Sequence, residues 1–147
     1  MLETVGDMWE EPCDMLCVLT NGDRRSDGCA VMGARTALQA KCHCPDMPEL
    51  LGELLRLRGN HVHDLGVRDG RRVLSFPTKH HWRDAFADLE LIRRSCRELV
   101  DAIGDQGMTR ILIPRPGCGA GRLGWSVVRP VLEEVLVDDK FVVISSP

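Results

Sequence analysis

The sequence has 147 residues, of which 44% are hydrophobic and 28% are charged. This length and composition are typical of a single domain with a buried core, and we expect one domain over residues 1–147. The formal net charge of −3 gives no sign of a strongly basic nucleic-acid groove or membrane surface, and no apolar run approaches the ~20 residues of a membrane span.

Seven cysteines, an odd number, are scattered along the chain. This pattern argues against a disulfide framework and for the reducing cytosol, so we expect a cytoplasmic protein. The Cys42-His43-Cys44 stretch has the residue types of a metal site. Zinc sites, however, use a wider cysteine spacing together with a second ligand pair, and the sequence offers no such pair. We therefore expect no metal site.

The first half of the chain alternates strands and helices. Residues 2–5 form a candidate edge strand, and the continuous apolar run 14–20 suits a strand buried on both faces. An Asn-Gly-Asp turn signal follows, and a polar loop leads to a helix expected over 34–41. A second helix, with leucines at helical spacing, is expected over 50–57 and ends at Gly59.

The next segment predicts a hairpin and a long amphipathic helix. We expect a strand over 61–65, a turn at Asp69-Gly70 and a strand over 72–76. A helix is expected over 84–103 because apolar residues recur at helical spacing. The face of that helix is Leu89, Ile92, Cys96, Leu99 and Ile103.

The last segment predicts a strand, a glycine-rich loop, a helix and a final strand. The strands are expected over 108–113 and 141–144, and the helix over 126–136. Pro130 fits that helix if Ser126 is the N-cap, because the first turn leaves its N–H groups without partners.

This alternation, with mostly buried strands, predicts an α/β fold in which helices cover both faces of a central mixed sheet. Ligands bind such sheets where loops leave the carboxyl ends of the strands. Three loops of this chain are informative in that respect, namely residues 21–33, 77–83 and 114–125.

The third of these loops has glycine at positions 117, 119, 121 and 124, between a strand and a helix. Glycine lets the backbone approach a ligand closely, and the N–H groups of such a loop can surround a phosphate. The spacing is neither the dinucleotide fingerprint nor a P-loop. We therefore expect a phosphate or diphosphate loop of another kind.

Four stretches resemble motifs of the macrodomain family, in the same chain order. They are Gly6-Asp7-Met8, VMGARTALQ over 31–39, FPTKHHWR over 76–83 and PRPGCGAGRLGW over 114–125. They are most similar to the branch that holds the terminal ADP-ribose protein glycohydrolase and the DNA ADP-ribosyl glycohydrolase antitoxins. The resemblance implies a three-layer α/β/α sandwich with an ADP-ribose cleft and no cofactor.

The resemblance also assigns roles to residues of the cleft. Asp7 would accept from the adenine amino group, Asn21 would lie near the distal ribose, and Gly33 and its neighbours would line the diphosphate and the distal ribose. The amides of 117–121 would wrap the diphosphate, and Lys79 would face the anomeric carbon. The predicted ligand-binding residues are Asp7, Met8, Asn21, Met32, Gly33, Ala34, Arg35, Thr78, Pro116, Gly117, Cys118, Gly119, Ala120 and Gly121, with Lys79 as the catalytic residue.

Two residues depart from the family pattern. Gly121 stands where the protein-directed members have an aspartate, so the lysine–aspartate mechanism lacks its acid here. The DNA-directed members rely on the lysine without that aspartate. Arg35 stands where the family usually has glycine, and its side chain could contact a phosphate or narrow the cleft.

Three functions follow from the resemblance. The first is an enzyme that hydrolyses carboxylate-linked ADP-ribosyl groups on proteins, in which neutral Lys79 attacks C1″ and water resolves the covalent intermediate. The second is a non-catalytic reader of ADP-ribose, and the third a glycohydrolase for ADP-ribosylated DNA bases. The negative net charge weakens the third, because DNA affinity depends on cationic contacts to phosphates. We expect a monomer whose partners are ADP-ribose and the modified macromolecule, without a membrane partner.

Overall fold

A six-stranded sheet forms the centre of the computed structural model, which describes residues 1–105 and 107–147. All strand pairs are parallel except the β3–β4 hairpin, which confirms the mixed sheet. In sheet order the strands are β1 (Leu2–Val5), β6 (Phe141–Ser145), β5 (Ile111–Pro114), β2 (Met15–Thr20), β4 (Arg71–Pro77) and β3 (Asp64–Arg68).

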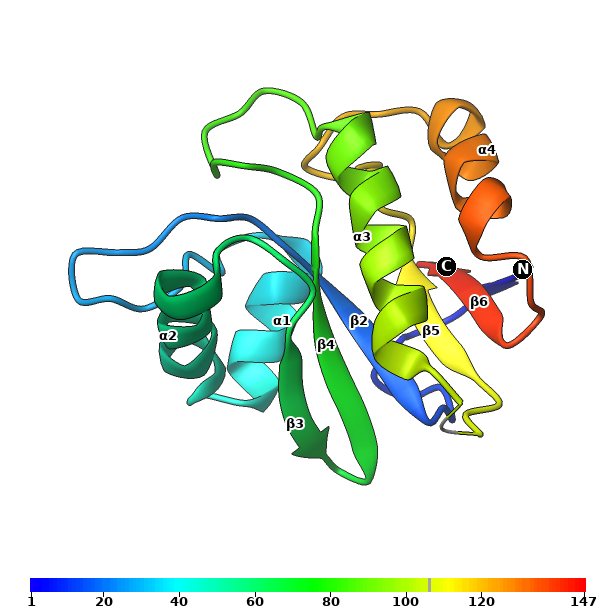
Figure 1. Ribbon diagram of the computed structural model, residues 1–147, viewed down its shortest axis with the longest axis horizontal. Coiled ribbons are helices and arrows are strands. Elements are labelled where there is room, and N and C mark those ends of the chain that lie inside the picture. The colour runs from blue at the N-terminus through cyan, green and yellow to red at the C-terminus, as the bar shows by residue number, and fades with distance from the viewer. Residues whose placement is uncertain (106) are drawn as a thin grey trace.

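Helices cover both faces of the sheet, as predicted (Figure 1). Within the described residues, none of the helices has the length and apolar character that a membrane span needs. On one face lie α1 (Arg35–His43) and α2 (Met47–Arg58), and on the other lie α3 (Leu89–Ile103) and α4 (Trp125–Val135).

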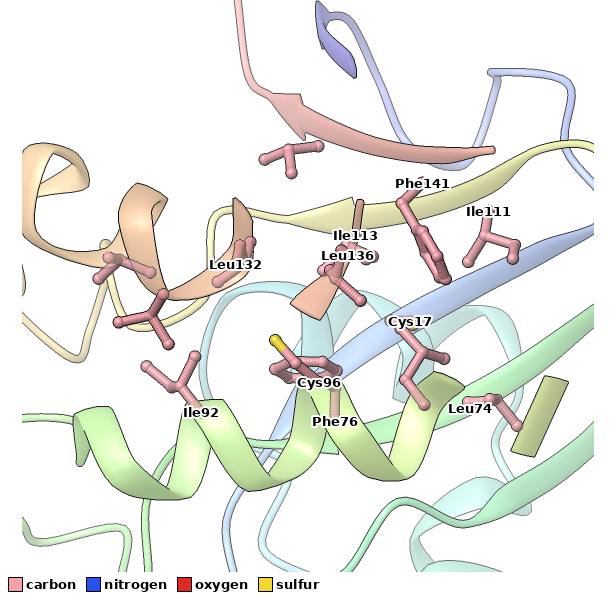
Figure 2. Close-up of a cluster of buried hydrophobic side chains, with 14 of the residues drawn as sticks. Cys17, Leu74, Phe76, Ile92, Cys96, Ile111, Ile113, Leu132, Leu136 and Phe141 are labelled. Atoms are coloured by element: carbon pink, nitrogen blue, oxygen red, sulfur yellow. The ribbon is translucent and has the colours of Figure 1, made fainter. Parts of the chain in front are cut away.

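The apolar run of β2 is continuous because each face of the strand belongs to a different core. Cys17 packs with α3 and α4, and Leu16 and Val18 pack with α1 and α2. Figure 2 shows the first of these clusters, in which Cys17 and Phe76 from the sheet gather with Ile92 and Cys96 of α3 and with residues of β5 and β6. Burial on both faces is what parallel central strands require.

The helix predicted to begin at residue 84 begins five residues later, at Leu89. Asp88 is the N-cap, because its carboxylate accepts from the N–H groups of Glu90 and Leu91. The N–H groups of Ala87 and Asp88 are bonded to carbonyls of two other loops. The segment before Leu89 therefore serves the loops at the sheet edge rather than the helix.

Two predicted strands also begin later than expected. The strand predicted from 61 begins at Asp64, because His61 and the Val62 N–H bind the Glu98 carboxylate on α3. The strand predicted from 108 begins at Ile111. The Asp14 carboxylate accepts hydrogen bonds from the N–H groups of Thr109 and Arg110, and these bonds lower the pKa of Asp14.

The Ser126 N-cap was wrong, because Gly124 is the N-cap and α4 begins at Trp125. Pro130 therefore lies beyond the first turn, within the helix, where it cannot donate to a carbonyl of the preceding turn. The predicted Asp69-Gly70 hairpin turn is confirmed, since both residues have the positive φ of a type I′ turn, at 51° and 76°.

Gly52 of α2 provides a stability prediction, because the backbone of 28–30 packs directly against it. A Cβ built on Gly52 would lie 2.0 Å from the Gly28 carbonyl oxygen and 2.9 Å from the Ala30 nitrogen. We expect Gly52→Ala to lower the free energy of unfolding by about 2–3 kcal/mol, because the loop must move to make room. Urea unfolding measures this, and Gly33→Ala, whose Cβ has nothing within 4 Å, is the control. Equal stability of the two variants would contradict the prediction.

Candidate functional site

A cleft with a volume of about 640 Å³ lies at the carboxyl ends of β2, β4, β5 and β6. The three loops expected from the sequence form most of its wall, and the end of β6 adds a fourth part. The lining residues are Leu19–Asn21, Val31, Gly33–Ala37, Thr78, Lys79, Trp82, Pro114, Arg115, Gly117–Gly121 and Ile144–Ser146.

The glycine loop (residues 114–124) is held in a tight conformation by its own backbone. The Leu123 N–H donates to the Gly117 carbonyl at 2.8 Å, and Gly117 has a φ of +74°. A Cβ on Gly121 would lie 2.7 Å from the Gly117 oxygen and 2.7 Å from the Ala87 Cβ. The loop therefore requires glycine at position 121, and the acid missing there has no room.

The lysine loop (residues 78–83) is fixed by backbone bonds to its neighbours. The Thr78 N–H donates to the Thr20 carbonyl at 3.0 Å, and the Asn60 side-chain amide donates to the Lys79 carbonyl at 3.0 Å. The Gly22 N–H reaches the His80 carbonyl at 3.1 Å. These bonds hold the half-buried Lys79 against the cleft.

One short segment before α3 joins the glycine loop to the lysine loop. The Ala87 N–H donates to the Gly121 carbonyl at 2.9 Å, and the Asp88 N–H donates to the Thr78 carbonyl at 3.0 Å. The glycine loop and the candidate nucleophile Lys79 are thus tied to the same short segment, and catalysis by positioned groups requires this kind of fixed arrangement.

The amino end of α1 forms the opposite wall. Its N-cap, Ala34, makes no side-chain capping bond, so the first N–H groups of the helix are available to an anion. The Thr36 hydroxyl accepts from the Leu19 N–H at 3.1 Å and ties the helix to β2. Asn21 bridges the same loop, with its amide donating to the Val31 carbonyl at 3.2 Å.

Cys118 is a second nucleophile type within the cleft, but its environment disfavours the thiolate. Burial raises the pKa of the Cys118 thiol, although Arg115 lowers it in part. Since the thiolate is the reactive form, Cys118 is a poor nucleophile at neutral pH.

The rim of the cleft carries a charged pair between two loops. Asp23 accepts from the His81 ring Nδ1 at 3.0 Å and from the Trp82 N–H at 2.7 Å. The hydrogen bond and charge of Asp23 raise the pKa of His81. Partial burial raises the pKa of Asp23, but the bonds from His81 and Trp82 outweigh it and lower that pKa.

This pair gives the rim a pH dependence. The stability that protonated His81 contributes is fully present below pH 6.5, its ordinary pKa. It is lost as the pH rises through the raised pKa of the folded protein. The stability that ionised Asp23 contributes is present above pH 3.8, its ordinary pKa, and is lost as the pH falls through the lowered pKa of the folded protein. We expect Asp23→Asn to return the His81 pKa towards 6.5 in an NMR titration. Asp27→Asn, which makes no bond to His81, is the control, and an unchanged His81 pKa in Asp23→Asn would contradict the assignment.

The cleft collects most of the residues predicted from the sequence. Because they come from three loops far apart in the chain, their meeting is a property of the sheet topology. The predicted residues on its wall are Asn21, Gly33, Ala34, Arg35, Thr78, Lys79, Gly117, Cys118, Gly119, Ala120 and Gly121.

Four predicted residues lie off the cleft wall. Met8 and Met32 are buried in the core with α1 and α2, and Pro116 is a buried residue of the glycine loop itself. Asp7 is exposed just after β1, where its carboxylate accepts from the Trp9 N–H at 2.9 Å. The neighbouring Gly6 N–H bonds to the Ser145 carbonyl, so Asp7 lies beside the β6 end of the cleft, and its adenine role stays a prediction.

The sequence reasoning missed the β6 contribution of residues 144–146. The signal was available, because 141–144 was predicted as a buried parallel strand and its carboxyl end must share the edge with the others. Trp82 also lines the cleft and is 52% exposed, and it was not among the ligand-binding residues predicted from the sequence.

The fold and the cleft have counterparts among known proteins. No family model matches the chain. The macrodomain of Thermus aquaticus DarG has a TM-score of 0.78 and 28% identity, with 99% of this chain and 97% of that chain covered. The macrodomain of Mycobacterium tuberculosis DarG has a TM-score of 0.80 and 27% identity, with 99% and 96% covered. The chain is a macrodomain.

A curated relative places the macrodomain in the branch that its motifs resemble. This chain is 30% identical over 138 residues to a DNA ADP-ribosyl glycohydrolase of Thermus aquaticus. The matched region covers 89% of this chain and 36% of the relative. The macrodomain spans about a third or less of the length of the curated relatives it matches. The resemblance found in the sequence is thereby confirmed for the family and the fold.

Proposed function

We propose that this macrodomain binds ADP-ribose in the cleft and hydrolyses ADP-ribosyl groups, with Lys79 as the nucleophile. The observation that carries the proposal is the meeting of three features in one cavity: the glycine loop, the uncapped amino end of α1, and Lys79. Backbone N–H groups on two sides suit a diphosphate, and a lysine held beside it suits attack on a sugar carbon. The names of the relatives, which act on ADP-ribosyl groups, support the same activity.

In the proposed reaction the neutral Lys79 amine forms a bond to C1″ and the bond from C1″ to the modified group breaks. The leaving group departs with the electron pair and takes up a proton from solvent. Water then attacks the same carbon, which releases ADP-ribose and restores the amine. The bonds that fix the Lys79 backbone reduce the entropy lost in reaching this geometry.

We further propose that the modified group is a nucleic-acid base. Trp82 lies at the rim with half of its surface exposed, and the Arg83 guanidinium lies 5.2 Å from its ring centroid. An exposed tryptophan beside an arginine is suited to stack on a base of a single strand. Both curated relatives carry DNA in their names.

The carboxylate-linked protein substrate, which was the first function inferred from the sequence, becomes the second candidate, and the same assay tests it. Wild-type protein is incubated with single-stranded DNA that carries ADP-ribosylated thymidine and, separately, with protein ADP-ribosylated on glutamate. We expect release of ADP-ribose from the DNA. Release from the protein alone would favour the second substrate, and binding of free ADP-ribose without any release would identify a reader. No binding at millimolar ADP-ribose would refute every version of the proposal.

The compartment is part of the proposal. All seven cysteines are free in the structure. Free, scattered cysteines are typical of reducing compartments, which supports action in the cytoplasm.

A further inference from the structure

Arg35 has a backbone conformation that arginine rarely adopts. It is the first residue of α1 and has a φ of +48°. Side chains other than those of glycine, asparagine and aspartate are disfavoured in this left-handed region, because the Cβ crowds the following carbonyl. Among the described residues, Asp69 and Arg122 are the other two non-glycine residues with positive φ, and Asp69 belongs to the hairpin turn. Strain of this kind points to a function for the side chain.

The Arg35 side chain crosses from the amino end of α1 to the glycine loop. A Cβ built on Gly119 would lie 3.2 Å from the Arg35 Nε and 3.6 Å from its Cδ. The stem of the arginine thus lies against Gly119, within the cleft that both residues line. Its position is between the two backbone walls that we assign to the diphosphate.

The charge of Arg35 has no partner within the described part of the protein. The structure records neither a hydrogen bond nor an ion pair from its guanidinium there, and the residue is exposed. Arg115, the other arginine on the cleft wall, is engaged, because it lies 3.8 Å from Glu3 and over the Trp125 ring. Arg35 is therefore the arginine of the cleft wall available to a ligand.

We propose that Arg35 binds the diphosphate of the ligand directly. This inference rests on the proposed function. A guanidinium presents a planar set of donors that matches two phosphate oxygens at once, and it carries a full positive charge. Backbone amides donate hydrogen bonds but carry no such charge. The left-handed backbone at position 35 aims the stem across Gly119, and a glycine at this position would provide neither charge nor contact.

The test is calorimetric titration of ADP-ribose into wild type, Arg35→Gln, Arg35→Lys and Arg35→Gly, at low and at high salt. We expect Arg35→Gln and Arg35→Gly to bind at least about tenfold more weakly and with less salt dependence, and Arg35→Lys to be intermediate. Arg35→Gly should also raise the melting temperature, because glycine accepts this φ without strain. Thermal unfolding of the same samples separates lost affinity from lost fold.

Arg58→Gln is the charge-matched control. Arg58 is an exposed arginine in the last turn of α2 that does not line the cleft, so its variant should bind ADP-ribose like wild type. Unchanged binding by Arg35→Gly would overturn the inference, and tighter binding would overturn it and show that the arginine narrows the cleft. If wild type itself binds no ADP-ribose, the proposed function fails and the inference with it. If wild type binds and Arg35→Gln binds equally, the inference alone fails.

Discussion

Replacing Lys79 with alanine is expected to lower the rate of ADP-ribose release by at least about 10³-fold, since no other group would form the covalent intermediate. The Lys79 side chain reaches the cleft from a loop whose backbone is held by Thr20, Gly22 and Asn60. These backbone bonds do not involve the amine, so the variant should keep the fold and its affinity for free ADP-ribose. The measurement is single-turnover release from ADP-ribosylated single-stranded DNA, together with titration of free ADP-ribose.

Lys41→Ala is the control for that experiment. Lys41 is an exposed lysine in the last turn of α1 and does not line the cleft. It should release ADP-ribose at the wild-type rate. Equal rates for wild type and Lys79→Ala would show that the lysine is not the nucleophile. Loss of both binding and release in Lys79→Ala would instead indicate a role in holding the ligand.

Introducing an aspartate at position 121 is expected to destroy the site rather than to complete a lysine–aspartate pair. The new Cβ would lie within 2.8 Å of the Gly117 backbone and the Ala87 side chain. Gly121→Ala alone should cost about 1–3 kcal/mol of the free energy of unfolding. Gly121→Asp should cost more, because it also places a carboxylate at a buried position.

Both Gly121 variants should lose ADP-ribose binding, since the Gly121 carbonyl ties the glycine loop to Ala87. Urea unfolding and calorimetric titration provide the two measurements. Gly33→Ala, in open space, is the stability control and should unfold like wild type. An active and stable Gly121→Asp variant would show that the loop can rearrange, and the steric account of the missing acid would then be wrong.

Sequence patterns predicted the elements well where local chemistry decides the structure. The apolar run of β2 and the glycine loop between β5 and α4 are found as expected. The Asp69-Gly70 turn is decided by residues that accept positive φ. The errors concern the starts of α3, β3 and β5, where Asp88, Glu98 and Asp14 bind backbone groups of their own or distant segments.

The site shows the same division. The loop residues could be assigned because glycine and lysine stood in recognisable motifs. The side chains of Met8 and Met32 lie in the core and not on the cleft wall, because a motif does not tell which side of a strand or loop faces the core; their ligand-binding role stays a prediction. At position 35 the sequence identified an arginine where the family usually has glycine. Its strained φ and its contact with Gly119 could be seen only in the folded chain.

The sequence by itself determined the α/β architecture, the place of the glycine loop and the resemblance to macrodomains, because spacing, apolar periodicity and glycine chemistry are local properties. The tertiary structure decided that four strand ends share one cleft and that the segment before α3 joins the glycine and lysine loops. It also decided that Gly121 has no room for an acid. These features depend on contacts between segments far apart in the chain, and such contacts exist only once the parallel sheet has aligned its carboxyl ends.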